Sequence, residues 1–204
     1  MITFIVLILL IILMIIFRLT ICNHMVSLNI MKSPIEESDT FNGIPSYYNA
    51  WDSNNKTIIN LNRLITLNHN LILEEVLNIY KSYDTSDEKI DHILLKYMGK
   101  LLNTSEKIPT LRNIISLFPD ITLVKISFFY PGSILPEFSA DNKNTKKYHY
   151  GLLIPNNDIG FKIKGYNVNW IEREGFIWDD KLVHSTWNNT LKPRIVIFAD
   201  YLHK

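Results

Sequence analysis

The chain has 204 residues, a formal net charge of +1 and a single cysteine, Cys22. This length suffices for one domain of ordinary size once a terminal segment is set aside. A nearly neutral chain with scattered Lys and Arg argues against a nucleic-acid partner, which normally requires a basic face. One cysteine excludes an intramolecular disulfide and any metal cluster held by several thiolates of the same chain.

The sequence begins with MITFIVLILLIILMIIF and carries no charge before Arg18. As a helix this stretch would span roughly 25 Å, and the apolar residues Leu19, Ile21 and Cys22 can lengthen it. We therefore predict a single-pass transmembrane anchor over residues 1–22. A cleaved signal peptide is the alternative, but it requires a basic start and a small-residue cleavage site, and this sequence has neither.

The orientation of the predicted anchor is left open by the sequence. Arg18 and Lys32 follow the apolar stretch, which favours a cytosolic body under the positive-inside rule. Three glycosylation triplets, which begin at Asn55, Asn103 and Asn188, would be usable in a lumenal body.

Residues 23–60 lack clear periodicity and contain Pro34, Gly43 and Pro45, so we expect a linker there and one domain over residues 61–204. Helical spacing of apolar residues predicts helices over 71–80, from a capping box at 85–88 through 101, and over 111–118. Beyond these helices, alternating and apolar runs predict strands over 121–130, 149–154, 159–164, 168–171, 176–178 and 194–201. Helices followed by strands indicate an α+β domain, in which the helices buttress a sandwich, barrel or jelly roll.

Three polar residues stand out against the apolar strands. His149 is expected to begin a strand, and His184 is expected between two strands. Strict alternation places Arg194 on the same strand face as Asp200. If that face is interior, the guanidinium needs an anion, which could be Asp200 or the carboxylate of a ligand. On pattern alone, structural histidines and a solvated arginine at the rim are the commoner outcome.

Four segments then add a family resemblance: ISFFYPGSILPEF, KYHYGLLIP, EGFIWDDKLVHSTWNNT and PRIVIFAD. Together they resemble, in order, motifs of the aspartyl/asparaginyl β-hydroxylases over roughly residues 109–201, and bacterial lipid A hydroxylases are similar over the same region. The resemblance implies a double-stranded β-helix, or jelly roll. It also implies Fe(II) and 2-oxoglutarate as cofactors and hydroxylation of an unactivated C–H bond in a peptide or lipid.

The resemblance also assigns roles to individual residues. Arg194 would hold the far carboxylate of 2-oxoglutarate, and Ser127, Lys147 and His149 would contact its other end. Lys147 stands where the family has arginine. Trp187 would line the mouth of the site near the substrate.

The metal ligands are where this sequence departs from the family pattern. His184 matches the distal metal-binding histidine, but Glu137 stands where the family has its first histidine. Ser139 replaces the Asp or Gly that follows that histidine in the family motif. A carboxylate with one imidazole would hold Fe(II) less tightly than two imidazoles. Two hypotheses follow: a hydroxylase with an altered metal site, or an inactive relative that serves as a membrane-tethered binding module.

Overall fold

The computed structural model describes residues 40–41, 44–45, 47–50, 53–80, 89–140, 145–155 and 158–202. The predicted anchor at residues 1–22 and the adjoining part of the linker lie outside the described residues, so both stay predictions. Of the helices that the structure describes, none is long and apolar enough to cross a membrane.

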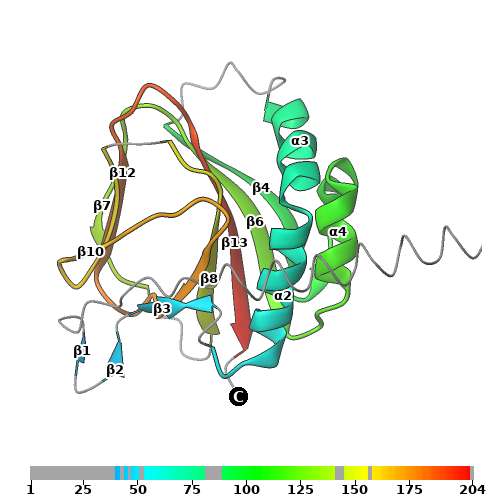
Figure 1. The fold of residues 1–204 in the computed structure, drawn as a ribbon, viewed down its shortest axis with the longest axis horizontal. Coiled ribbons are helices and arrows are strands. Elements are labelled where there is room, and N and C mark those ends of the chain that lie inside the picture. Colours follow the sequence, from blue (N-terminus) through cyan, green and yellow to red (C-terminus); the bar gives the residue numbers. More distant parts are fainter. Residues whose placement is uncertain are drawn as a thin grey trace, which may run out of the picture. The chain divides into compact units, whose positions relative to one another are not determined.

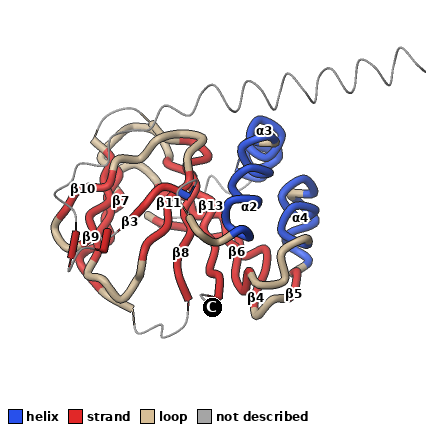
Figure 2. The backbone as a smooth tube through the Cα atoms, turned by 60° about the horizontal axis from the view of Figure 1, so that its bottom comes forward, coloured by secondary structure: helices blue, strands red, loops and turns tan. Residues whose placement is uncertain are grey.

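Three α-helices form one layer of the domain (Figures 1 and 2). They are α2 (Lys56–Leu67), α3 (His69–Tyr80) and α4 (Pro109–Ser116), and a 3₁₀ helix, η2 (Asn103–Lys107), precedes α4. Asn55 caps α2, since its side-chain oxygen accepts hydrogen bonds from the amides of Thr57 and Ile58. The predicted helices over 71–80 and 111–118 therefore correspond to α3 and α4, whereas α2 begins inside the stretch predicted as a linker.

Two antiparallel sheets form the rest of the domain, as expected for a jelly roll, and a small hairpin precedes them. The seven-stranded sheet has the order β3-β11-β8-β13-β6-β4-β5, the four-stranded sheet has the order β10-β9-β12-β7, and β1 pairs with β2. The strands are β1 (Thr40–Phe41), β2 (Ile44–Pro45), β3 (Tyr47–Asn49), β4 (Ile90–Tyr97), β5 (Lys100–Leu101), β6 (Ile121–Phe129), β7 (Ser133–Phe138), β8 (Thr145–Leu153), β9 (Ile159–Ile163), β10 (Tyr166–Val168), β11 (Gly175–Trp178), β12 (His184–Asn188) and β13 (Arg194–Leu202).

The helix predicted to continue to residue 101 is wrong, because residues 90–97 and 100–101 form the strands β4 and β5. Apolar residues in this segment recur at helical intervals, but Ile93 and Leu95 alternate into the core and β4 pairs with β6 over most of its length. Met98 and Gly99 both adopt positive φ, which makes the tight turn between the two strands. Long-range strand pairing therefore overrides the local periodicity. The proposed capping box at 85–88 lies outside the described residues.

Two strands of the four-stranded sheet are absent from the sequence-based prediction. β7 contains Pro136, which normally marks a break, and β12 reads HSTWN with few apolar residues. The pairing of β7 with β12 shifts register between His184 and Thr186, so a bulge accommodates the proline. His184 is therefore the first residue of a strand rather than part of a connection. His149 lies in the middle of β8, which begins at Thr145.

The seven-stranded sheet has two faces of different character. Its outer face packs under the helices and supplies most of the large apolar core, including Tyr148, Ile197 and Ile126. The hydroxyl of Tyr148 donates to the Asn62 side chain of α2 at 2.8 Å, which ties that helix to β8. The inner face turns toward the four-stranded sheet and a second cluster of mainly aromatic residues. As predicted, Arg194 and Asp200 share this inner face.

Candidate ligand-binding site

Strand register sets the predicted site residues in successive rows across the inner face of the large sheet. Lys147 of β8 pairs with Asp200 of β13. In the next row Phe198 of β13 lies between His149 of β8 and Lys125 of β6, and the row after that has Val196 between Gly151 and Ser127. Arg194 pairs with Phe129 in the last row. The register thus brings four predicted cosubstrate residues, Ser127, Lys147, His149 and Arg194, to one face.

Arg194 is fully buried, with 0% of its surface exposed. Its guanidinium donates to the Thr186 hydroxyl at 2.6 Å and to the carbonyl oxygens of Gly160 and Trp187 at 3.2 and 3.3 Å. It lies 4.1 Å from the ring centroid of Phe129. Its Nε has no hydrogen-bond partner, and no described carboxylate lies within ion-pair distance. Burial lowers the pKa of Arg194 to about 9, which leaves it charged at neutral pH.

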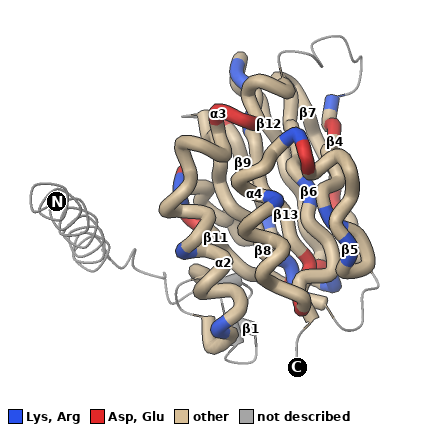
Figure 3. The backbone as a smooth tube through the Cα atoms, turned by 90° about the vertical axis from the view of Figure 1, so that its right-hand side faces the viewer, with Lys and Arg blue, Asp and Glu red and all other residues tan. Residues whose placement is uncertain are grey.

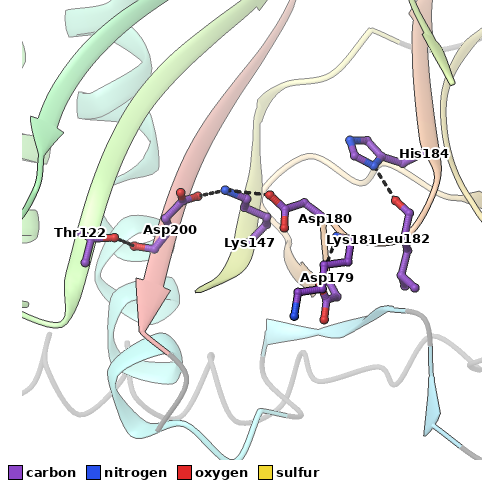
Figure 4. A network of polar contacts seen from close by, with 8 residues as sticks. All are labelled: Thr122, Lys147, Asp179, Asp180, Lys181, Leu182, His184 and Asp200. Atoms are coloured by element: carbon purple, nitrogen blue, oxygen red, sulfur yellow. Dashed lines mark hydrogen bonds and ion pairs between the residues drawn. The ribbon is translucent and has the colours of Figure 1, made fainter. Parts of the chain in front are cut away.

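Asp200 does not serve as the anion for Arg194, contrary to one of the two possibilities raised by the sequence. Its carboxylate accepts from Lys147 Nζ at 2.6 Å, and Asp180 contacts the same ammonium at 3.1 Å (Figure 4). All three side chains are largely buried. Lys147 is therefore neutralised by two carboxylates of the protein.

His149 lies in a cage of aromatic rings. Its ring centroid lies between 4.7 and 5.7 Å from those of Phe161, Trp170, Phe176, Trp178 and Phe198. Neither ring nitrogen has a hydrogen-bond partner. Burial holds the pKa of His149 well below its usual value, and the positive charge of Lys125 adds to that shift. The imidazole is therefore neutral and rests against the face of Trp170.

Ser127 belongs to a polar group at the other edge of the inner face. Its hydroxyl lies 3.0 Å from Nδ1 of His92 on β4. Lys125, two residues earlier on β6, has its ammonium 4.7 Å from the ring centroid of Phe198. Lys125 and His92 were not predicted, because neither stands in a motif and their meeting depends on the pairing of β4 with β6.

His184 has the orientation that a metal-binding histidine needs. Its Nδ1 donates to the carbonyl oxygen of Leu182 at 2.7 Å (Figure 4), so Nε2 carries the lone pair. Burial lowers its pKa and favours the neutral ring, although the hydrogen bond to Leu182 opposes this shift. The ring packs against Phe138 and Trp178.

Glu137 is exposed, and the structure does not bring it to His184. Its neighbour Phe138 is the residue that pairs with His184 and contacts its ring, at 4.0 Å between centroids. Glu137 and Pro136 form the bulge opposite Ser185, so neither is paired with a residue of β12. Ser139 supplies no carboxylate.

An iron site built from the described residues is therefore incomplete. Among them, no three His, Cys, Asp or Glu side chains converge in a way that could hold a metal ion. His184 alone fits the ligand set expected for Fe(II), which commonly combines two histidines and a carboxylate.

Trp187 lines a cavity of about 620 Å³ beside the barrel. Its ring lies directly over Gly160, where an added Cβ would fall 1.9 Å from a ring carbon. Trp170 lines the same cavity and also contacts Arg194, at 5.1 Å from the ring centroid. The cavity therefore lies against Gly160 and Trp170, which both contact Arg194.

Charged residues over the described chain are mixed in sign, with Lys and Arg positions interspersed among Asp and Glu positions (Figure 3). This distribution fits the expectation from composition.

Comparison with known protein families gives one match over more than half of the chain. The model described as Aspartyl/Asparaginyl beta-hydroxylase matches residues 67–204. That range includes the α3 and α4 helices, every strand from β4 onward and all the site residues named above.

Two curated relatives match smaller parts. An ornithine lipid ester-linked acyl 2-hydroxylase from Rhizobium tropici is 31% identical over 86 residues, which are 41% of this chain and 31% of that protein. The human aspartyl/asparaginyl beta-hydroxylase is 23% identical over 106 residues, which are 50% of this chain and 14% of that protein. The chain thus spans less than a third of the length of either relative.

Solved structures with a similar fold include a prolyl hydroxylase from Trichoplax adhaerens in complex with a hypoxia inducible factor peptide. Its TM-score is 0.44 at 14% identity, with 70% of this chain and 89% of that chain covered. A viral collagen prolyl hydroxylase from Paramecium Bursaria Chlorella virus-1 gives a TM-score of 0.43 at 10% identity, with 64% and 88% covered.

Proposed function

Since this chain belongs to the aspartyl/asparaginyl β-hydroxylase family, we propose that it binds 2-oxoglutarate inside its barrel through Arg194. The observation that carries this proposal is a fully buried guanidinium with no carboxylate of the described chain within ion-pair distance. Burying an unpaired charge is costly, and a ligand carboxylate would supply the missing anion. Arginine suits that role because its planar fork can donate two parallel hydrogen bonds to one carboxylate.

The protein groups around Arg194 fix its position without neutralising it. Its partners are a hydroxyl and two carbonyl oxygens, which accept hydrogen bonds but carry no formal charge. Phe129 and Trp170 pack against the guanidinium and restrict its rotation. Such a cation is positioned in advance for an anion.

The second candidate function is hydroxylation of a lipid or peptide C–H bond. Fe(II) would be the metal, and the predicted anchor would hold the enzyme at a membrane. His184 favours it, because its Nε2 lone pair is available. The names of the two relatives favour a lipid acyl group or an Asp or Asn side chain as the substrate. The exposure of Glu137 argues against hydroxylation. It supports the alternative of a membrane-tethered module that binds 2-oxoglutarate without hydroxylating a substrate.

We expect Arg194→Met to weaken 2-oxoglutarate binding by at least a hundredfold, because both charge and bidentate hydrogen bonding are lost. Isothermal titration of the full chain in detergent measures this change. Arg194→Lys keeps the charge and loses the fork, so it should bind with intermediate affinity.

The fold should survive Arg194→Met, because the substitution removes a buried charge that has no counter-ion. A cooperative unfolding transition of the ligand-free variant checks this point. Undiminished 2-oxoglutarate affinity in a folded Arg194→Met protein would overturn the proposed function.

The second candidate is tested by the metal. A hydroxylase should bind Mn(II), used as a redox-stable substitute for Fe(II), and lose that binding in His184→Ala. Turnover should release succinate from 2-oxoglutarate only when Fe(II) is present. Wild-type protein that binds no metal and releases no succinate would exclude hydroxylation and leave the binding module. Succinate release that persists in His184→Ala would instead show that His184 is not a metal ligand.

A further inference from the structure

The inner face of the barrel has more basic than acidic groups. Three cations point into it, Lys125, Lys147 and Arg194, and both carboxylates near them, Asp180 and Asp200, contact Lys147. Within the described chain, Lys125 and Arg194 have no ion-pair partner within 4 Å. Two unpaired positive charges therefore remain in a poorly solvated interior.

Lys125 shares the Phe198 ring with Lys147, whose ammonium lies 5.2 Å from the same ring centroid. The ammonium of Lys125 lies over the ring of Phe198, and burial lowers its pKa, although Asp200 opposes that shift. Nearby, the Ser127 hydroxyl and Nδ1 of His92 bond to each other, and this pair keeps one further hydrogen-bond donor for a ligand. His92 is exposed, so solvent and small solutes can reach this group.

Lys125 and Arg194 lie on the same face of the seven-stranded sheet, as the register of β6 and β13 shows. Arg194 pairs with Phe129, and Ser127 and Lys125 follow two and four residues away on the same face of β6. At about 3.3 Å per residue these positions lie roughly 7 and 13 Å from the Arg194 row. The row between them carries Gly151, Val196 and Ser127, with His92 of β4 next to Ser127.

We propose that Lys125, together with Ser127 and His92, binds the second carboxylate of the dicarboxylate whose first carboxylate is held by Arg194. The ligand is then bound by protein cations alone, with no metal ion. This inference rests on the proposed function. Lys125, Ser127 and His92 would contact the carboxylate that a metal ion and Lys147 were expected to contact.

Two observations favour Lys125 over the expected partners of that second carboxylate. Lys147 is already neutralised by Asp180 and Asp200, so it has no unpaired charge to offer. The described residues also provide His184 but no complete set of metal ligands. Lys125 is the remaining cation on this face.

The test is isothermal titration of the full chain with 2-oxoglutarate in the presence of EDTA. Wild type should bind, and Lys125→Met should bind at least tenfold more weakly, because an ion pair and its hydrogen bonds are lost. Lys107→Met removes an exposed lysine of η2 and is the matched control, with unchanged affinity expected. The Lys125→Arg variant should retain most of the affinity.

The outcomes separate this inference from the proposed function. Equal affinity of wild type and Lys125→Met in EDTA would overturn the inference and leave Arg194 as the anchor. If wild type binds 2-oxoglutarate only after Mn(II) replaces EDTA, the inference about Lys125 is also overturned, while the proposed function of Arg194 stands. Absence of 2-oxoglutarate binding in wild type under both conditions would refute the proposed function itself.

Discussion

Lys147→Met should destabilise the folded domain by about 3–5 kcal/mol, the range found when one partner of a buried ion pair is removed. The side chain of Lys147 is 7% exposed, and its ammonium contacts Asp180 at 3.1 Å and Asp200 at 2.6 Å. Without it, two buried carboxylates would face each other in a poorly solvated interior. Burial already raises the pKa of Asp200, and the contact with Lys147 opposes that shift. Chemical denaturation at neutral pH measures the loss.

Two further variants identify the cause of that loss. Lys147→Arg restores the family's residue and its charge, so it should cost far less than Lys147→Met. Adding Asp200→Asn to Lys147→Met should recover part of the stability, because one uncompensated carboxylate is removed. If Lys147→Met costs less than about 1 kcal/mol, the pair behaves as a solvated surface ion pair and the argument from burial fails.

The same residues indicate how far the sequence could predict the site. Alternation along β13 correctly placed Arg194 and Asp200 on one face, since strand geometry fixes that relation locally. Their partners could not be predicted in the same way. The contact between Lys147 and Asp200 joins residues 53 positions apart, and it depends on the register between β8 and β13. The sequence pattern predicts on which face of a strand a side chain lies, but not which strand pairs with it.

The family motifs predict which residue types stand at the site better than they predict which way each side chain faces. Motif matching correctly identified the family, and the inner-face residues that it selected lie together. It also assigns Glu137 to the metal, and Glu137 is exposed and lies in the bulge opposite Ser185. A bulge inserts one residue into a strand pair and changes which side chains face inward, so alignment alone cannot predict its effect.

The missed strand β4 has a different cause. Its apolar residues fit a helical stripe as well as a strand with one irregularity, and the pairing with β6 shifts register between Leu94 and Lys96. Lys96 is buried and donates to the carbonyl oxygens of Ile115 and Phe118 at the end of α4. Only the assembled domain makes a buried lysine at that position favourable.

His149→Phe should make the folded protein less sensitive to acid without reducing its stability at pH 7. The unfolded chain protonates histidine near pH 6.5, whereas the folded state holds His149 neutral to well below that value. Between those two pKa values the unfolded state binds one more proton, so stability present above pH 6.5 is lost as the pH falls. Each such histidine changes the free energy of unfolding by up to about 1.4 kcal/mol per pH unit.

His69, His92 and His184 also have lowered pKa values, so the wild-type protein should lose stability steeply between pH 6.5 and 5. His149→Phe should reduce the pH dependence of the free energy of unfolding by about 1.4 kcal/mol per pH unit, which is the contribution of one proton. At pH 7 it should be neutral or stabilising, because the aromatic cage leaves both imidazole nitrogens without partners.

Denaturant titrations at half-unit pH steps measure both effects. Phe198→Leu is the control, since it changes a ring 4.7 Å from His149 and no titratable group, so the wild-type slope should persist. A slope in His149→Phe equal to that of wild type would mean that the caged imidazole takes up a proton in the folded state. The cage would then have to admit water or a counter-ion, because a charged ring among five aromatic side chains is otherwise too costly to persist.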